Sequence, residues 1–147
     1  MGLRTSIKKY LYRLKFNKKV DDLDFTNNTI LVTGGNSGIG LALTKKLLYL
    51  ENKVIATYKK DSSNLSSINN EKLIILKCDN RDLNDFSHFE EKIKDINLDI
   101  IINCAGVFGP PGQNIEELEF EKFQEVLMVN SLSILKIIQI ILKQKKK

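Results

Sequence analysis

Residue types that build metal sites and base-stacking surfaces are scarce in this 147-residue chain. It contains no tryptophan, one histidine and two cysteines. Cys78 and Cys104 lie far from the Cys-x-x-Cys spacing of a zinc ligand pair, and His88 is the single imidazole, so the sequence predicts no metal site. Two unclustered thiols are typical of a reducing compartment, and we expect a cytoplasmic protein.

A long uninterrupted hydrophobic run is also missing. A transmembrane helix needs about 20 apolar residues. The longest candidate, residues 133–142, is interrupted by Lys136 and Gln139. The sequence therefore predicts no transmembrane segment.

Positive charge is concentrated at the two ends of the chain. The net charge is +5, but residues 1–19 hold seven Lys/Arg and no acid, and residues 143–147 hold four Lys. The residues between carry 12 basic and 18 acidic side chains, a net charge of −6. Because a nucleic-acid surface needs basic groups spread over a folded face, we expect no nucleic acid as a partner.

Residues 1–27 are predicted to form a basic amphipathic extension. Leu3, Ile7, Leu11 and Leu14 fall at helical spacing, with Arg and Lys residues between them. Such a helix can lie on the domain as a solvated extension, contact a membrane surface or act as an organelle-targeting segment. The sequence leaves these alternatives open.

Residues 28–147 alternate short β-branched runs with longer segments of helical periodicity. This alternation is typical of βαβ units around a parallel sheet and predicts the α/β class. Strands are predicted at 29–33, 53–58, 73–77 and 98–103, and helices at 38–50, within 83–96 and from about 119 onward. The polar segment 61–71 has room for only a short helix, and residues 106–113 are a predicted loop.

A glycine-rich turn, TGGNSGIG at residues 33–40, follows the first predicted strand and opens the first predicted helix. In a dinucleotide-binding turn, Gly34 would let the chain leave the strand sharply. Gly38 would let the backbone approach a pyrophosphate, and Gly40 would let the helix pack close to the sheet. The free amides and the positive end of that helix attract phosphate. A generic glycine turn is the alternative, which the position between strand and helix disfavours.

The motif TGGNSGIG resembles the TGxxxGIG fingerprint of the short-chain dehydrogenase/reductase family, and three further pieces occur in that family's order. Asp79 and Asn80 follow the third strand, where the family places an acid beside the adenine ring. Residues 103–106 (NCAG) resemble the NNAG motif with Cys104 in place of the second Asn, and residues 129–130 resemble the VN dipeptide of the fourth helix. Residues 107–110 (VFGP) are similar to the C-factor-like branch.

The resemblance implies a Rossmann-type doubly wound parallel sheet, truncated after about four strands in the order 3-2-1-4. It also implies a nicotinamide dinucleotide cofactor and a place for Asn130 in the proton relay. The implied cofactor-binding residues are Gly34, Asn36, Ser37, Gly38, Ile39, Gly40, Asp79, Asn80, Asn103, Ala105 and Gly106. The residue types alone leave other roles open, because Asp79 can cap a turn, Asn103 and Gly106 can serve strand-end geometry, and Asn130 can be inert.

The end of the second predicted strand bears on the choice between NAD and NADP. NAD enzymes place an acid there for the ribose hydroxyls, whereas NADP enzymes place groups that hold the 2′-phosphate. Tyr58, Lys59 and Lys60 occupy this end, and the first acid is Asp61. The pattern favours NADP over NAD, with Ser37, Tyr58 and Lys59 as contacts. A solvated edge of two lysines is the alternative.

The resemblance also implies catalytic groups that these 147 residues do not show. The family carries a serine after a fifth strand and a Tyr-x-x-x-Lys pair on the helix that follows. None of the four tyrosines, Tyr10, Tyr12, Tyr49 and Tyr58, has Lys four residues later in the right element. Without that acid, hydride transfer to or from a small alcohol or carbonyl substrate has no matched proton partner.

We therefore expect residues 28–147 to be a partial NAD(P)-binding domain that lacks the carboxy-terminal catalytic part and is inactive alone. A non-catalytic nucleotide-binding or interaction module is the alternative. The apolar fourth strand and the aliphatic last helix predict exposed surface that favours association. The expected partners are a second copy of the chain or a missing carboxy-terminal half.

Overall fold

The computed structural model describes residues 25–112 and 114–144, and a four-stranded parallel sheet lies at its centre. The strands are β1 (Thr29–Thr33), β2 (Lys53–Tyr58), β3 (Leu73–Lys77) and β4 (Ile100–Asn103). Their order in the sheet is β3-β2-β1-β4, so the predicted order 3-2-1-4 is confirmed. Of the predicted amino-terminal extension, residues 1–24 lie outside the described residues.

The central strands are apolar at consecutive positions because both faces of the sheet are covered. Ile30, Leu31 and Val32 of β1 are fully buried. Parallel strands covered on both faces need this pattern, and polar alternation would place hydrophilic groups in the core. In the register of the sheet, Leu31 lies between Ile55 of β2 and Ile101 of β4.

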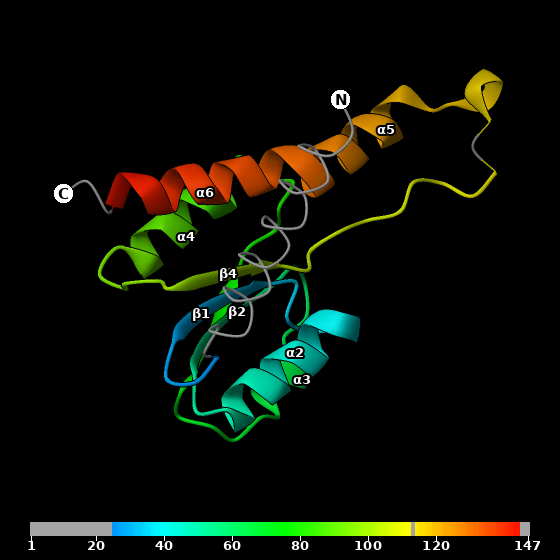
Figure 1. The fold of residues 1–147 in the computed structure, drawn as a ribbon. Helices are drawn as coiled ribbons and strands as arrows, with labels where there is room; N and C mark the ends of the chain where they lie inside the picture. Colours follow the sequence, from blue (N-terminus) through cyan, green and yellow to red (C-terminus); the bar gives the residue numbers. More distant parts are fainter. Residues whose placement is uncertain (1–24, 113, 145–147) are drawn as a thin grey trace, which may run out of the picture.

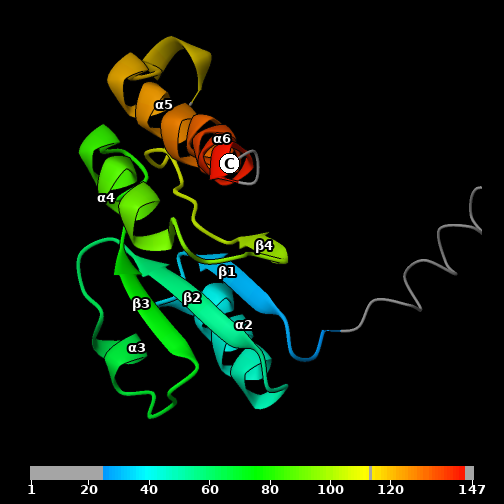
Figure 2. The ribbon, with the colours of Figure 1, turned by 90° about the vertical axis from the view of Figure 1, so that its left-hand side faces the viewer.

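Helices cover the two faces of the sheet as separate layers (Figures 1 and 2). One layer holds α2 (Gly38–Tyr49) and the short α3 (Ser63–Ser66), and the other holds α4 (Leu83–Ile93) and α6 (Ser133–Gln144). The buried cluster on the α2 side consists of Ile30, Val32, Leu47, Leu48, Val54, Ala56 and Leu65. The buried cluster on the α4 and α6 side consists of Leu31, Ile55, Leu76, Cys78, Phe86, Phe89, Ile93, Leu98, Ile137, Ile140 and Ile141.

The last helical segment is continuous over 25 residues, Phe120–Gln144. It comprises α5 (Phe120–Leu127), a π-helical turn η2 (Met128–Leu132) and α6, and the 3-10 turn η1 (Ile115–Glu117) precedes it. Figure 1 shows α6 lying over α4 while α5 projects away from the body. None of the α5 residues is buried, whereas α6 buries Ser133, Ile137, Ile140 and Ile141.

By length and composition, this helix is apolar enough to cross a membrane. The predicted absence of a transmembrane segment stays a prediction, because the length and composition of this helix are compatible with a span but do not establish one. The prediction considered residues 133–142 alone, but the π-helical turn keeps the helix continuous from Phe120 and adds further apolar residues. A core helix can meet the same criteria, and one face of this helix packs on α4 and the sheet.

Candidate functional site

The carboxyl ends of the four strands meet at one edge of the sheet and open into a cleft of about 650 Å³. The cleft lies where the chain order reverses, with β2 and β3 on one side of β1 and β4 on the other. Open α/β sheets bind their ligands at this kind of switch point. The predicted site residues that line the cleft are Gly34, Asn36, Ser37, Gly38, Ile39, Gly40, Tyr58, Lys59, Asp79, Asn80, Ala105, Gly106 and Asn130.

The glycine-rich turn is compact because three of its glycines leave no room for a side chain, and a Cβ on Gly35 would lie 2.8 Å from the Cβ of Ala56. Gly34 has φ +65°, and a Cβ there would lie 2.9 Å from the Cα of Ala105. A Cβ on Gly40 would collide with the carbonyl oxygen of Gly34. Gly40 therefore lets α2 begin directly against the turn that leaves β1. The prediction had placed this close approach between the helix and the sheet.

Two buried threonines hold the strand ends together around this turn. The hydroxyl of Thr33 donates to Asn103 Oδ1 at 2.7 Å and accepts from the amides of Cys104 and Ala105 at 3.2 and 3.1 Å. Thr57 accepts from the amide of Gly34 through Oγ1 at 3.2 Å and from the amide of Gly35 through its carbonyl at 2.8 Å. Sequence reasoning missed both threonines, although a hydroxyl residue at a strand end was a visible signal.

Asn103 is the predicted site residue that does not line the cleft. Its side-chain oxygen is occupied by Thr33, at the last pair of the register between β1 and β4. This geometry agrees with the alternative of a strand-end role. The contacts from this segment to the cleft come instead from Cys104, Ala105 and Gly106.

The amino-terminal end of α2 faces the cleft without an acid. Ser37 is the N-cap residue, its hydroxyl makes no capping hydrogen bond, and no acidic residue lies in the first turn. The first amides of a helix have no intrahelical acceptor, and the helix dipole makes this end positive. Asn36 has another task, because its side-chain oxygen accepts from the amide of Leu65 in α3 at 3.1 Å.

The end of β2 brings positive charge to the cleft. Tyr58, Lys59 and Lys60 line it, and within residues 25–112 and 114–144 neither lysine forms an ion pair. The carboxylate of Asp61 accepts from the hydroxyl of Ser63 at 2.6 Å and from its amide at 3.0 Å. The hydrogen bond from the hydroxyl lowers the pKa of Asp61 most, and the one from the amide lowers it further.

Asp79 at the end of β3 is engaged by Arg81, a cleft residue that sequence reasoning missed. Arg81 donates to Asp79 Oδ1 from Nε at 3.0 Å and to Oδ2 from Nη2 at 2.7 Å, and its amide also donates to Oδ1 at 3.1 Å. The side-chain hydrogen bonds from Arg81 lower the pKa of Asp79, and the charge of Lys59 adds to the effect. Asp79 thus caps the turn and still lines the cleft.

The two remaining predicted asparagines are anchored by their side chains. Asn80 is buried and donates through Nδ2 to the hydroxyl of Ser133 at 3.0 Å, so its amide points toward the helix layer. Asn130 lies in the π-helical turn. It pairs with the main chain of Val107, accepting from the amide through Oδ1 and donating to the carbonyl through Nδ2, both at 2.9 Å.

Both thiols line the cleft, but they differ in burial: Cys78 is buried and Cys104 is partly buried. Burial, followed by the charges of Asp85 and Asp79, raises the pKa of Cys78 to about 12. Burial also raises the pKa of Cys104, which replaces the second Asn of the motif and lines the cleft. Both thiols are free, and no group of three or more potential metal ligands occurs in the part of the chain that the structure describes.

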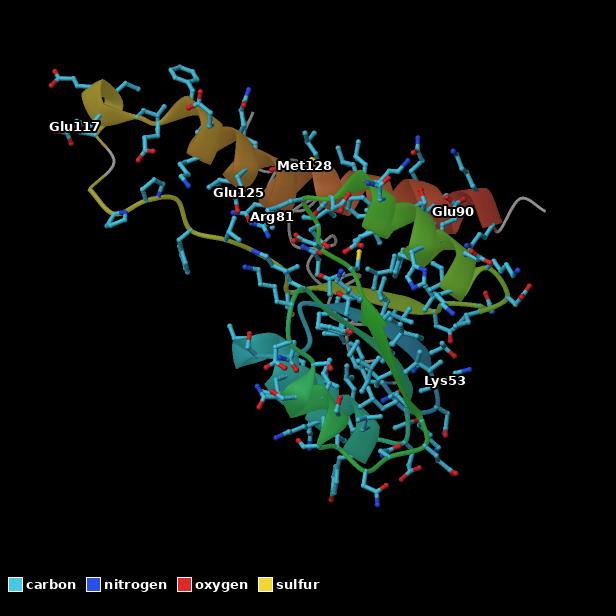
Figure 3. The ribbon with its side chains drawn as sticks, turned by 180° about the vertical axis from the view of Figure 1, so that it is seen from behind. Lys53, Arg81, Glu90, Glu117, Glu125 and Met128 are labelled. Carbon is cyan, nitrogen blue, oxygen red and sulfur yellow. The ribbon has the colours of Figure 1, made fainter. Side chains whose placement is uncertain are left out.

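The one Tyr-x-x-x-Lys spacing in the sequence lies far from this site. Tyr49 is the last residue of α2 and is 77% exposed. Lys53 begins β2 at the amino-terminal edge of the sheet, away from Arg81 in Figure 3. Because the cleft lies at the carboxyl ends of the strands, Tyr49 and Lys53 cannot act on a ligand bound there.

Comparison with known proteins defines the class. The profile described as short chain dehydrogenase matches residues 28–147, and the chain belongs to this family of nicotinamide-dependent oxidoreductases. It is 34% identical over 115 residues to the uncharacterised oxidoreductase DltE of Bacillus subtilis, an alignment that covers 74% of this chain and 41% of DltE. It is 30% identical over 114 residues to the uncharacterised oxidoreductase YDL114W of Saccharomyces cerevisiae, covering 76% of this chain and 36% of that protein.

Solved structures agree with this assignment. The Sniffer protein of Caenorhabditis elegans superposes with a TM-score of 0.73 at 28% identity, over 81% of this chain and 54% of that one. A short-chain dehydrogenase/reductase from Serratia marcescens gives 0.72 at 26% identity, over 82% and 51%. The chain thus spans about half the length of these relatives or less. The family and the fold predicted from the motifs are confirmed, while the C-factor-like branch stays a prediction.

Proposed function

We propose that the cleft binds NADP(H) in preference to NAD(H), as the cofactor-binding part of an oxidoreductase acting on an alcohol or carbonyl substrate. The observation that carries the preference is the charge at the end of β2. Lys59 and Lys60 line the cleft and form no ion pair with any described residue, while the carboxylate of Asp61, which also lines the cleft, accepts a hydrogen bond from Ser63. A 2′-phosphate meets two ammonium groups there, whereas a carboxylate aimed at the ribose would repel it.

The glycine-rich turn is suited to the pyrophosphate. The backbone at Gly34 and Gly38 carries no side chain into the cleft, and the first amides of α2 have no intrahelical acceptor. The hydroxyl of Ser37 makes no capping bond and can donate to a phosphate oxygen. These features support binding through amides, a hydroxyl and the helix dipole.

The 147 residues supply binding and positioning groups for this reaction. The bound cofactor would supply the hydride, and Asn130 would lie beside the reacting end, where its side chain holds the main chain of Val107. Tyr49 and Lys53 lie away from the cleft, so among the described residues no Tyr-x-x-x-Lys pair supports proton transfer there. We propose that this chain alone binds cofactor without turnover, which also fits a non-catalytic nucleotide-binding module.

A titration of the purified chain with NADPH and NADH tests the proposal. We expect NADPH to bind more tightly than NADH. Lys59→Ala should weaken NADPH binding roughly tenfold and leave the affinity for NADH unchanged, because a charge-assisted contact to the 2′-phosphate is lost. Lys92→Ala, which removes an exposed lysine of α4, is the matched control. Adding aldehydes to the NADPH complex should leave the nicotinamide absorbance unchanged.

Three results would each contradict part of this proposal. Absence of binding at millimolar NADPH would remove the cofactor assignment altogether. Tighter binding of NADH than of NADPH would remove only the role given to Lys59 and Tyr58. Oxidation of NADPH at an ordinary enzymatic rate would show that another group supplies the proton.

A further inference from the structure

Helix α5 has few attachments to the rest of the molecule. It buries none of its residues, and it continues into η2 and α6 along the chain. Among the described residues, one ion pair joins α5 to the sheet edge, between Arg81 Nη1 and Glu125 Oε1 at 2.9 Å. Figure 3 shows the two side chains next to each other, with Glu117 at the far tip of the projecting segment.

Arg81 uses its guanidinium on two sides at once. Nε and Nη2 hold both oxygens of Asp79, while Nη1 reaches Glu125 on α5. The side chain of Arg81 is 33% exposed, that of Asp79 18% and that of Glu125 35%. The planar fork of arginine fixes the angles between these nitrogens. If the guanidinium turns to follow Glu125, the nitrogens that hold Asp79 therefore turn with it.

The hydrogen bonds leave Asp79 with capacity for one more donor. An ionised carboxylate accepts at about four positions. Oδ1 accepts from Nε and from the main-chain amide of Arg81, and Oδ2 accepts from Nη2. The remaining position lies on Oδ2 of a residue that lines the cleft. A ligand group that fits it must donate, as the amino group of adenine does and the carbonyl oxygen of hypoxanthine does not.

We propose that Arg81 is a positioning residue that couples adenine binding at Asp79 to the docking of α5 through Glu125. This inference rests on the proposed function, because it assigns the adenine end of the same cleft. Glu125 limits the orientations of Arg81, and Arg81 in turn orients the Asp79 carboxylate. Coupling between two sites is reciprocal, so a bound adenine dinucleotide holds α5 against the body.

Binding measurements on a double-mutant cycle test the coupling. The ligands are NADPH and its hypoxanthine counterpart, and the variants of the full chain are Arg81→Ala, Glu125→Gln and the pair together. We expect Arg81→Ala to weaken NADPH binding roughly tenfold. It should also reduce the ratio between the affinity for NADPH and the affinity for the hypoxanthine analogue. Glu125→Gln should weaken NADPH binding about twofold to fivefold, as expected for an ion pair whose side chains are about one third exposed. The double variant should bind no worse than Arg81→Ala.

Two controls separate positioning from a general structural role. Glu121→Gln removes another acid of α5 that forms no ion pair in the described structure, and it should bind NADPH like the wild type. Arg81→Lys keeps the charge but loses the planar fork, and it should lie between the wild type and Arg81→Ala. Amide exchange in residues 120–127 should slow when NADPH binds to the wild type, and not in Glu125→Gln.

The outcomes distinguish this inference from the function on which it rests. Absence of NADPH binding by the wild-type chain would overturn the proposed function and the coupling with it. NADPH binding that both single variants leave unchanged would overturn the coupling alone. Fully additive losses in the double variant would also overturn it, because Glu125 would then act independently of Arg81.

Discussion

At the scale of single residues, Asp79 is held in the cleft by hydrogen bonds of both its side chain and its main chain. Its carboxylate accepts two side-chain bonds and one main-chain bond from Arg81, and its own amide donates to Asp85 Oδ2 at 2.7 Å. The hydrogen bonds from Arg81 lower its pKa below the ordinary value. Because the folded state favours the ionised form, this group stabilises the protein above its unfolded-state pKa.

The sign of this shift predicts how Asp79 affects stability as the pH changes. The stabilisation is fully present above about pH 4, the ordinary range of an aspartate, and is lost as the pH falls through the lower folded-state pKa. Thermal unfolding of the wild type and of Asp79→Asn should therefore differ by a constant amount from pH 7 to about pH 5. The difference should then shrink in more acidic buffer. A difference that vanishes already at pH 6 would refute the assignment.

At the scale of elements, the π-helical turn and the segment after β4 depend on each other. Asn130 lies in η2, and its amide makes two hydrogen bonds to the main chain of Val107. π-Helical turns occur as single insertions and are frequent at functional sites. Here the turn places a side-chain amide where it pairs with a segment that would otherwise leave main-chain groups unpaired.

Substitution of Asn130 tests this dependence. Asn130→Ala removes both bonds, which lie at exposed positions where water can take over, so we expect a loss of about 1 kcal/mol in the free energy of unfolding. Amide exchange at Val107 should accelerate. The matched control is Asn97→Ala, an exposed asparagine between α4 and β4, which should lose less than about 0.5 kcal/mol. Equal losses in the two variants would contradict the role of Asn130.

At the scale of the whole molecule, apolar side chains are exposed on the edge strand β4 and on α6. In the described sheet β4 pairs with β1 alone, and Ile101 is 38% exposed. On α6, Leu135 is 64% exposed and Leu142 54%. An unpaired strand edge can pair with another chain, and a contiguous apolar surface favours association.

We therefore propose that the isolated chain associates through β4 and α6, and sedimentation velocity tests it. The wild type should show a sedimentation coefficient that rises with concentration. Leu135→Glu should shift it toward the monomer, because a charge on the apolar surface of α6 must be desolvated in the contact. Leu83→Glu, at an exposed leucine that begins α4, is the matched control. A wild type that stays monomeric at every concentration would contradict the proposal.

Local patterns in the sequence determined the sheet and the location of the cleft. The predicted bounds of β1, β2 and β3 agree with the structure. Continuous apolar runs bounded by polar segments indicate strands covered on both faces, and parallel strands bring their carboxyl ends to one edge. The spacing in TGGNSGIG also anticipated the turn, because a positive φ at Gly34 and a close approach at Gly40 are requirements on the backbone itself.

The tertiary structure alone decided which way the polar side chains point. Asn36 faces α3, Asn80 faces Ser133, and Asn103 faces Thr33, although all three were predicted as cofactor contacts. The link between Arg81 and Glu125 joins residues 44 positions apart. Such contacts depend on how distant elements pack, and a short amide or guanidinium binds whichever partner the packing brings within about 3 Å. The spacing of residues along the chain does not determine the distances between elements that pack together.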